Sequence, residues 1–87
     1  MTQTAKVIIY TTAWCGYCAA AKRLLNSKQV TFEEIAVDGN PELRAEIAER
    51  SGRRTVPQIF INEQSVGGYD DIAALDASGE LEQLLTS

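Results

Sequence analysis

Hydrophobic residues along the chain follow two different periods, and each period predicts a kind of element. The apolar run at Lys6–Tyr10 (KVIIY) is typical of a buried strand. Between residues 16 and 28, apolar side chains recur every three or four positions, which predicts an amphipathic helix. The β-rich stretch Val30–Val37 (VTFEEIAV) predicts a second strand, whose register is left open by two adjacent acidic residues, Glu33 and Glu34.

Cap and turn residues divide the second half of the chain. Asn40–Pro41–Glu42 offers a cap, a first-turn proline and an acidic side chain, so it predicts a helix that Gly52 can end. Gln58–Ile61 (QIFI) predicts a third strand. A turn at Asn62–Gln64 would join it to a short fourth strand at Ser65–Val66.

The order of these elements predicts the fold class. Gly67–Gly68 ends the fourth strand, and two short helices are expected at residues 70–77 and 79–85. A βαβ unit followed by a helix, a hairpin and further helices implies an α/β fold in one domain, residues 1–87. We expect a mixed four-stranded sheet with helices on both faces. Ligands bind at the carboxyl edge of such sheets, and both cysteines of the chain lie there.

Composition narrows the class of protein. With 45% hydrophobic residues, the 87-residue chain can build a core without a covalent staple. A net charge of −4 with no histidine argues against nucleic-acid binding, because an acidic surface repels phosphates. The opening residues lack the apolar region of a signal peptide, and the run Val7–Tyr10 is too short to span a membrane. We therefore expect a cytoplasmic protein, and a reducing compartment seldom keeps a permanent disulfide.

The cysteine pair, Cys15 and Cys18, leaves three hypotheses. Structural zinc needs four nitrogen or sulfur ligands, and the chain has two thiols and no histidine. A structural disulfide over so short a loop would add only about 2 kcal/mol. A reactive dithiol is favoured, because Cys-x-x-Cys beside a βαβ unit is typical of redox proteins.

The predicted helix gives the two thiols different tasks. Cys15 lies at its amino end, where unpaired N–H groups favour an anion. Such positions lower thiol pKa values from about 8.5 to about 3.5–7.5, and the thiolate is the attacking species. Cys18 lies one turn inside the helix, where it can resolve a mixed disulfide at Cys15.

Three short motifs follow one another along the chain: Cys15–Gly16–Tyr17–Cys18, Thr55–Val56–Pro57 and Gly67–Gly68–Tyr69–Asp70–Asp71. In order and spacing they resemble three motifs of dithiol glutaredoxins. These are the active-site motif, most often Cys-Pro-Tyr-Cys; the Thr-Val-Pro motif, whose proline is cis; and the glutathione-binding turn Gly-Gly-x-Asp-Asp. The resemblance covers nearly the whole chain and implies the thioredoxin fold.

The resemblance also implies an activity, with glutathione as the reductant. Cys15 would be the nucleophile and Cys18 the resolving thiol in the reduction of protein disulfides and of glutathione mixed disulfides. The glutathione-binding residues that it implies are Tyr17, Arg44, Thr55, Val56, Pro57, Gly68, Tyr69, Asp70 and Asp71.

Some of these positions have a specific implied role. Asp71, together with Asp70, would meet the γ-glutamyl ammonium, and Arg44 the glycyl carboxylate. Tyr17 would form one wall of the groove. For Asp70 the alternative is a plain helix cap.

The implied partners are glutathione and proteins that are glutathionylated or carry disulfides, with ribonucleotide reductase as a family-level candidate. A monomer is expected. One alternative is an iron–sulfur carrier. Gly16 replaces the motif proline, and some such glutaredoxins bridge a [2Fe–2S] cluster between two monomers, with Cys15 as a ligand.

The other alternative is an electron donor that thioredoxin reductase reduces. Trp14–Cys15–Gly16 resembles thioredoxin, whereas the turn at Gly67–Asp71 argues against that family. One further departure concerns Thr12, which stands where many glutaredoxins carry a lysine. A cation beside Cys15 and the glutathione carboxylate is therefore missing.

Overall fold

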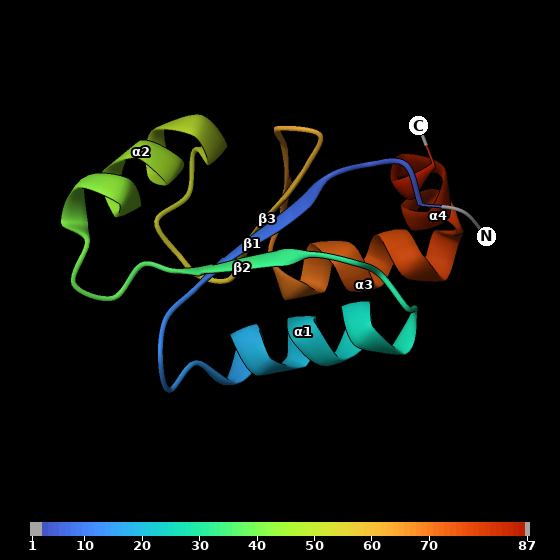
Figure 1. The fold of residues 1–87 in the computed structure, drawn as a ribbon, viewed down its shortest axis with the longest axis horizontal. Coiled ribbons are helices and arrows are strands. Elements are labelled where there is room, and N and C mark those ends of the chain that lie inside the picture. Colours follow the sequence, from blue (N-terminus) through green and yellow to red (C-terminus); the bar gives the residue numbers. More distant parts are fainter. Residues whose placement is uncertain (1–2, 87) are drawn as a thin grey trace.

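Four strands form one mixed sheet in the computed structural model, which describes residues 3–86 (Figure 1). The strands are β1 (Val7–Thr11), β2 (Glu33–Ala36), β3 (Gln58–Ile61) and β4 (Gln64–Gly67), in the order β2-β1-β3-β4. The β1–β2 pair is parallel, and the pairs β1–β3 and β3–β4 are antiparallel. The predicted mixed sheet is confirmed. Residues 1, 2 and 87 of the predicted domain lie outside the described residues.

Helices cover both faces of this sheet, as predicted. They are α1 (Gly16–Ser27), α2 (Pro41–Ser51), α3 (Tyr69–Ser78) and α4 (Glu80–Leu85). Figure 1 shows α1 and α3 together on one side of the sheet and α2 at its other side. Within residues 3–86, no helix has the length and apolar character needed to cross a bilayer.

Each face has its own buried cluster. The larger cluster lies under α1, α3 and α4 and consists of Ala5, Val7, Ile9, Ala21, Leu25, Val30, Ile59, Ile61, Ile72, Leu81 and Leu85. The smaller one lies under α2 and consists of Tyr10, Val37, Ile47 and Phe60. The periodicity of residues 16–28 correctly predicts that α1 buries one face, on which Cys18, Ala21 and Leu25 lie.

The predicted strand boundaries differ from the observed ones for local reasons. Lys6 is not part of β1, because its backbone N–H donates to Asn62 Oδ1 at 2.9 Å. β2 does not begin at Val30, because the Val30 N–H closes the end of α1 by donating to the Leu25 carbonyl at 2.9 Å. The hairpin turn consists of Asn62 and Glu63, both with positive φ, which suits the right-handed twist of the strands.

The caps of α2 are those that the sequence predicts. Asn40 Oδ1 accepts a hydrogen bond from the Leu43 N–H at 3.2 Å. Gly52 ends the helix with φ +77°.

The turn between β4 and α3 has no room for a side chain at Gly67 and only a tight space at Gly68. Gly67 has φ +105°, and a Cβ there would collide with the Asp71 carboxylate. Asp71 Oδ2 accepts the Gly68 N–H at 2.9 Å and so closes the turn. A Cβ on Gly68 would come within 3.2 Å of the Pro57 carbonyl oxygen. The turn is therefore packed directly against the loop that precedes β3.

Replacing Gly67 by alanine should destabilise the protein more than the same change at Gly79. Both residues have positive φ, which costs an L-residue about 1–2 kcal/mol. Gly79 faces open space, whereas the methyl group at position 67 would also displace Asp71 from its hydrogen bond, adding about 1 kcal/mol. Urea unfolding of both variants measures the difference. Equal losses would show that the Asp71 contact does not constrain the turn.

Candidate functional site

Cys15 and Cys18 lie at the start of α1 and are joined by a disulfide, with their Cα atoms 5.2 Å apart. Cys15 is the N-cap residue, with extended backbone, and its Sγ accepts the Cys18 N–H at 3.1 Å. Cys15 is half-buried, whereas Cys18 is only 2% exposed. A substrate from solution can therefore reach the first sulfur and not the second.

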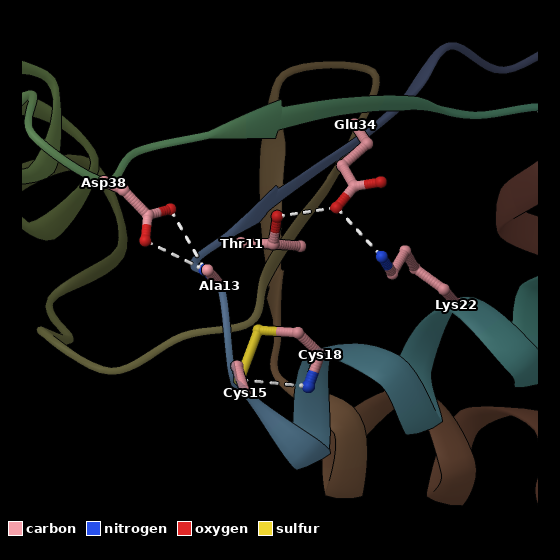
Figure 2. Close-up of polar contacts among 7 residues, drawn as sticks. All are labelled: Thr11, Ala13, Cys15, Cys18, Lys22, Glu34 and Asp38. Carbon is pink, nitrogen blue, oxygen red and sulfur yellow. Dashed lines mark hydrogen bonds and ion pairs between the residues drawn. A yellow bond between two sulfur atoms is a disulfide. The ribbon is translucent and has the colours of Figure 1, made fainter.

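The loop before Cys15 is held by the carboxylate of Asp38, which lies between β2 and α2. The Ala13 N–H donates to both oxygens of Asp38, at 2.9 and 3.1 Å (Figure 2). Trp14 follows with φ +59°, an unusual conformation for a bulky residue. Its side chain is fully exposed. The backbone thus reaches Cys15 through a constrained bulge.

The second motif lies beside the reactive sulfur. The Val56–Pro57 peptide bond is cis, as the resemblance implies. The Val56 carbonyl oxygen lies 3.8 Å from Cys15 Sγ. The loop is held by Gln58, whose side-chain amide donates to the Arg53 carbonyl at 2.7 Å.

The third motif contacts the other two. The rings of Tyr17 and Tyr69 lie 6.4 Å apart between centroids, a separation typical of aromatic pairs. Gly68 packs on the Pro57 carbonyl, as described above. The fold therefore brings the three motifs together in pairs, although they are spread over more than half of the chain.

Asp71 has a partner that the sequence analysis missed. Its Oδ2 accepts from Arg53 Nη1 at 2.7 Å as well as from the Gly68 N–H. The Arg53 hydrogen bond, helped by the Gly68 amide, lowers the pKa of Asp71 below its ordinary value. Asp71, and not Asp70, makes the contact that closes the helix start, and Asp70 is exposed. The two arginines that directly precede Thr55, Arg53 and Arg54, are the feature of the sequence that could have indicated a cationic partner for Asp71.

Arg44 lies in a different hollow from the cysteines. It is on α2, where its Nη2 donates to the Arg54 carbonyl at 3.4 Å. Both arginines line a groove of about 550 Å³ that includes Pro41 and Ala48 and neither cysteine. Thr55 follows Arg54 directly in the loop before β3, and its side chain is exposed.

A second groove, of about 610 Å³, includes both cysteines and runs toward the edge strand β2. Thr12 and Trp14 line it from the loop, and Glu34 and Asp38 from β2 and the segment after it. Glu34 Oε2 accepts from the Thr11 hydroxyl at 2.7 Å and from Lys22 Nζ at 3.0 Å. These bonds, the Thr11 bond first, lower the pKa of Glu34, so its carboxylate is charged at neutral pH. Neither Glu34 nor Asp38 belongs to a motif that would have placed it near the cysteines.

Comparison with known proteins agrees with this geometry. The family model described as Glutaredoxin matches residues 7–66. A glutaredoxin of Pseudomonas aeruginosa is 59% identical over 81 residues, which are 93% of this chain and 96% of that protein. Glutaredoxin 3 of Escherichia coli K12 is 57% identical over 81 residues, 93% of this chain and 98% of that protein.

A solved structure has the same fold. It is the crystal structure of a buckwheat glutaredoxin–glutathione complex, with a TM-score of 0.88 and 27% identity, covering 94% of this chain and 77% of that one. The expected thioredoxin fold is confirmed, and so is the resemblance that the three motifs indicate. The chain belongs to the glutaredoxin family of thiol–disulfide oxidoreductases.

Proposed function

We propose that the protein uses glutathione to reduce protein disulfides and glutathione mixed disulfides, with Cys15 as nucleophile and Cys18 as resolving thiol. The observation that carries the proposal is the difference between the two sulfurs. Cys15 is accessible and caps α1, and Cys18 is buried one turn further along. An accessible nucleophile beside an enclosed thiol is the arrangement that a two-step exchange requires.

The start of α1 favours the thiolate of Cys15. The Cys18 N–H already points at Cys15 Sγ, and the helix dipole adds a partial positive charge there. We propose that this end of the helix activates the sulfur of Cys15.

The reduction of a protein disulfide then takes two exchanges. The Cys15 thiolate attacks one target sulfur, the target S–S bond breaks, and the departing thiolate takes a proton from water. Cys18 loses its proton to solvent and attacks Cys15 Sγ, which releases the second target thiol and leaves the Cys15–Cys18 disulfide.

Two glutathione thiolates regenerate the enzyme. The first attacks Cys15 and frees Cys18, and the second removes the first as glutathione disulfide, so that two electrons pass to the target. A glutathione mixed disulfide needs only Cys15, which takes the glutathionyl group and gives it to a second glutathione.

The proposed glutathione site lies on the side of Val56 and Gly68. The Val56 backbone, next to Cys15, suits strand-like pairing with a short peptide. The amides at the start of α3 suit the γ-glutamyl carboxylate. The hydrogen bonds that Asp71 accepts from Arg53 and from the Gly68 N–H both go to Oδ2. The other oxygen, Oδ1, takes part in neither bond, and we propose that it meets the γ-glutamyl ammonium. The glutathione complex of the buckwheat relative supports this choice of ligand.

The remaining predicted residues have supporting roles in this proposal. Arg44 and Arg54 place positive charge beyond Thr55, which favours the glycyl carboxylate at longer range. Tyr17 and Tyr69 form an aromatic wall next to the sulfur.

Serine variants of the two cysteines should separate the two steps. Cys15→Ser should abolish both activities, because no nucleophile remains. Cys18→Ser should keep much of the activity on a glutathionylated peptide and lose the reduction of protein disulfides. NADPH consumption coupled through glutathione reductase measures both. Substantial activity of the Cys15 variant on either substrate would refute the assignment.

Asp71→Asn should weaken glutathione binding about three- to fivefold, as expected for a partly exposed ion pair, whereas Asp70→Asn should not. Isothermal titration of the Cys18→Ser background with glutathione compares the two variants. Because the Arg53 hydrogen bond lowers the pKa of Asp71 below its ordinary value, its carboxylate is ionised at both pH 7 and pH 5. The difference should be equal at pH 7 and pH 5 and shrink as the pH falls through the Asp71 pKa. Equal affinities at pH 7 would remove Asp71 from the site.

A further inference from the structure

Trp14 is a large apolar side chain placed fully in solvent directly before the nucleophile. Its relative exposure is 103%, and the next most exposed large hydrophobic residue among residues 3–86, Tyr17, is 64% exposed. An exposed aromatic beside a reactive group is a feature of protein-binding surfaces, where tryptophan is enriched among the anchor residues. The proposed glutathione contacts do not involve Trp14.

The backbone at Trp14 is held in a conformation that costs free energy. Its φ of +59° is unfavourable for any residue with a Cβ. The residues on both sides fix it: Ala13 through both oxygens of Asp38, and Cys15 through the cap of α1. Strain kept in place by neighbouring contacts is common at functional sites. Here its result is that the indole points away from the core.

The groove beside Trp14 differs in charge from the proposed glutathione side. Among its described lining residues are two carboxylates, Glu34 and Asp38, against one ammonium, Lys22 (Figure 2). The lining includes neither Val56 nor Gly68. On the glutathione side, by contrast, arginines 44, 53 and 54 outnumber the carboxylates of Glu49 and Asp71. An anionic tripeptide is therefore disfavoured in this groove, and a chain with a cationic side chain is favoured.

We propose that Trp14 and this groove bind the protein substrate. An extended segment of the target would place an apolar side chain, next to its disulfide cysteine, on Trp14. A basic side chain would lie toward Asp38, because the charge of Glu34 is already paired with Lys22. The groove reaches Cys15 itself, so the target sulfur and the segment around it can be held together. The inference deepens the proposed function and rests on it.

Kinetics with small and peptide substrates test the inference. The peptide probe is the symmetric disulfide of Gly-Ala-Cys-Leu-Lys-Gly, compared with versions carrying Ser for Leu or Glu for Lys. The small probe is the mixed disulfide of glutathione and 2-mercaptoethanol. Each is assayed for kcat/KM with glutathione and glutathione reductase, using the wild type, Trp14→Ala and Trp14→Phe.

Trp14→Ala should lower kcat/KM for the Leu-Lys peptide about tenfold, the effect of losing one aromatic anchor, and leave the small probe within about twofold. The variant should no longer distinguish the Leu peptide from the Ser peptide, and Trp14→Phe should restore most of the difference. The wild type should prefer Lys over Glu at low salt, and less so at high salt, because surface charges are screened.

Equal losses for both probes, or no loss for either, would overturn the inference while leaving the proposed function intact. If the wild type fails to turn over the small probe, the proposed function itself fails. The melting temperature of Trp14→Gly provides a separate measurement, because glycine relieves the positive φ. It should equal or exceed that of the wild type. A clear decrease would show that Trp14 is retained for stability and would count against the inference.

Discussion

The first N–H groups of α1 lack partners in the helix, and the sulfur of Cys15 accepts one of them, that of Cys18, at 3.1 Å. This one contact caps α1, which begins at Gly16, and fixes Cys15 at its amino end. The packing of α1 on the core then buries Cys18 one turn along. The difference between two otherwise identical thiols thus comes from their positions on a helix.

The neighbouring loops are arranged around that sulfur from two sides. On one side, the carbonyl of Val56 lies 3.8 Å away, and the glycine turn packs on Pro57. On the other side, Asp38 fixes the bulge that exposes Trp14. Arginines 44, 53 and 54 lie on the side of Val56. In the groove beside Trp14, the two carboxylates Glu34 and Asp38 outnumber the single ammonium group of Lys22. The proposed anionic reductant and the proposed protein substrate would therefore approach the sulfur of Cys15 from different directions.

Local features made most of the fold predictable. Periodicity predicted the helix faces, and Asn40 and Gly52 predicted the bounds of α2, because caps act over a few residues. The pairing of Asp71 with Arg53, and of Ala13 with Asp38, joins residues 18 and 25 positions apart. Such contacts depend on tertiary packing and leave no local pattern. The sequence also gives no reason for a glycine at position 16. In the structure, a Cβ at Gly16 would have no atom within 4 Å.

Alkylation of the reduced protein as a function of pH tests the central claim, that the start of α1 activates one thiol and protects the other. With iodoacetamide at about pH 6, where ordinary thiols are almost fully protonated, peptide mapping should find rapid labelling confined to Cys15. Labelling that starts only near pH 8, or that is shared equally between Cys15 and Cys18, would contradict the account.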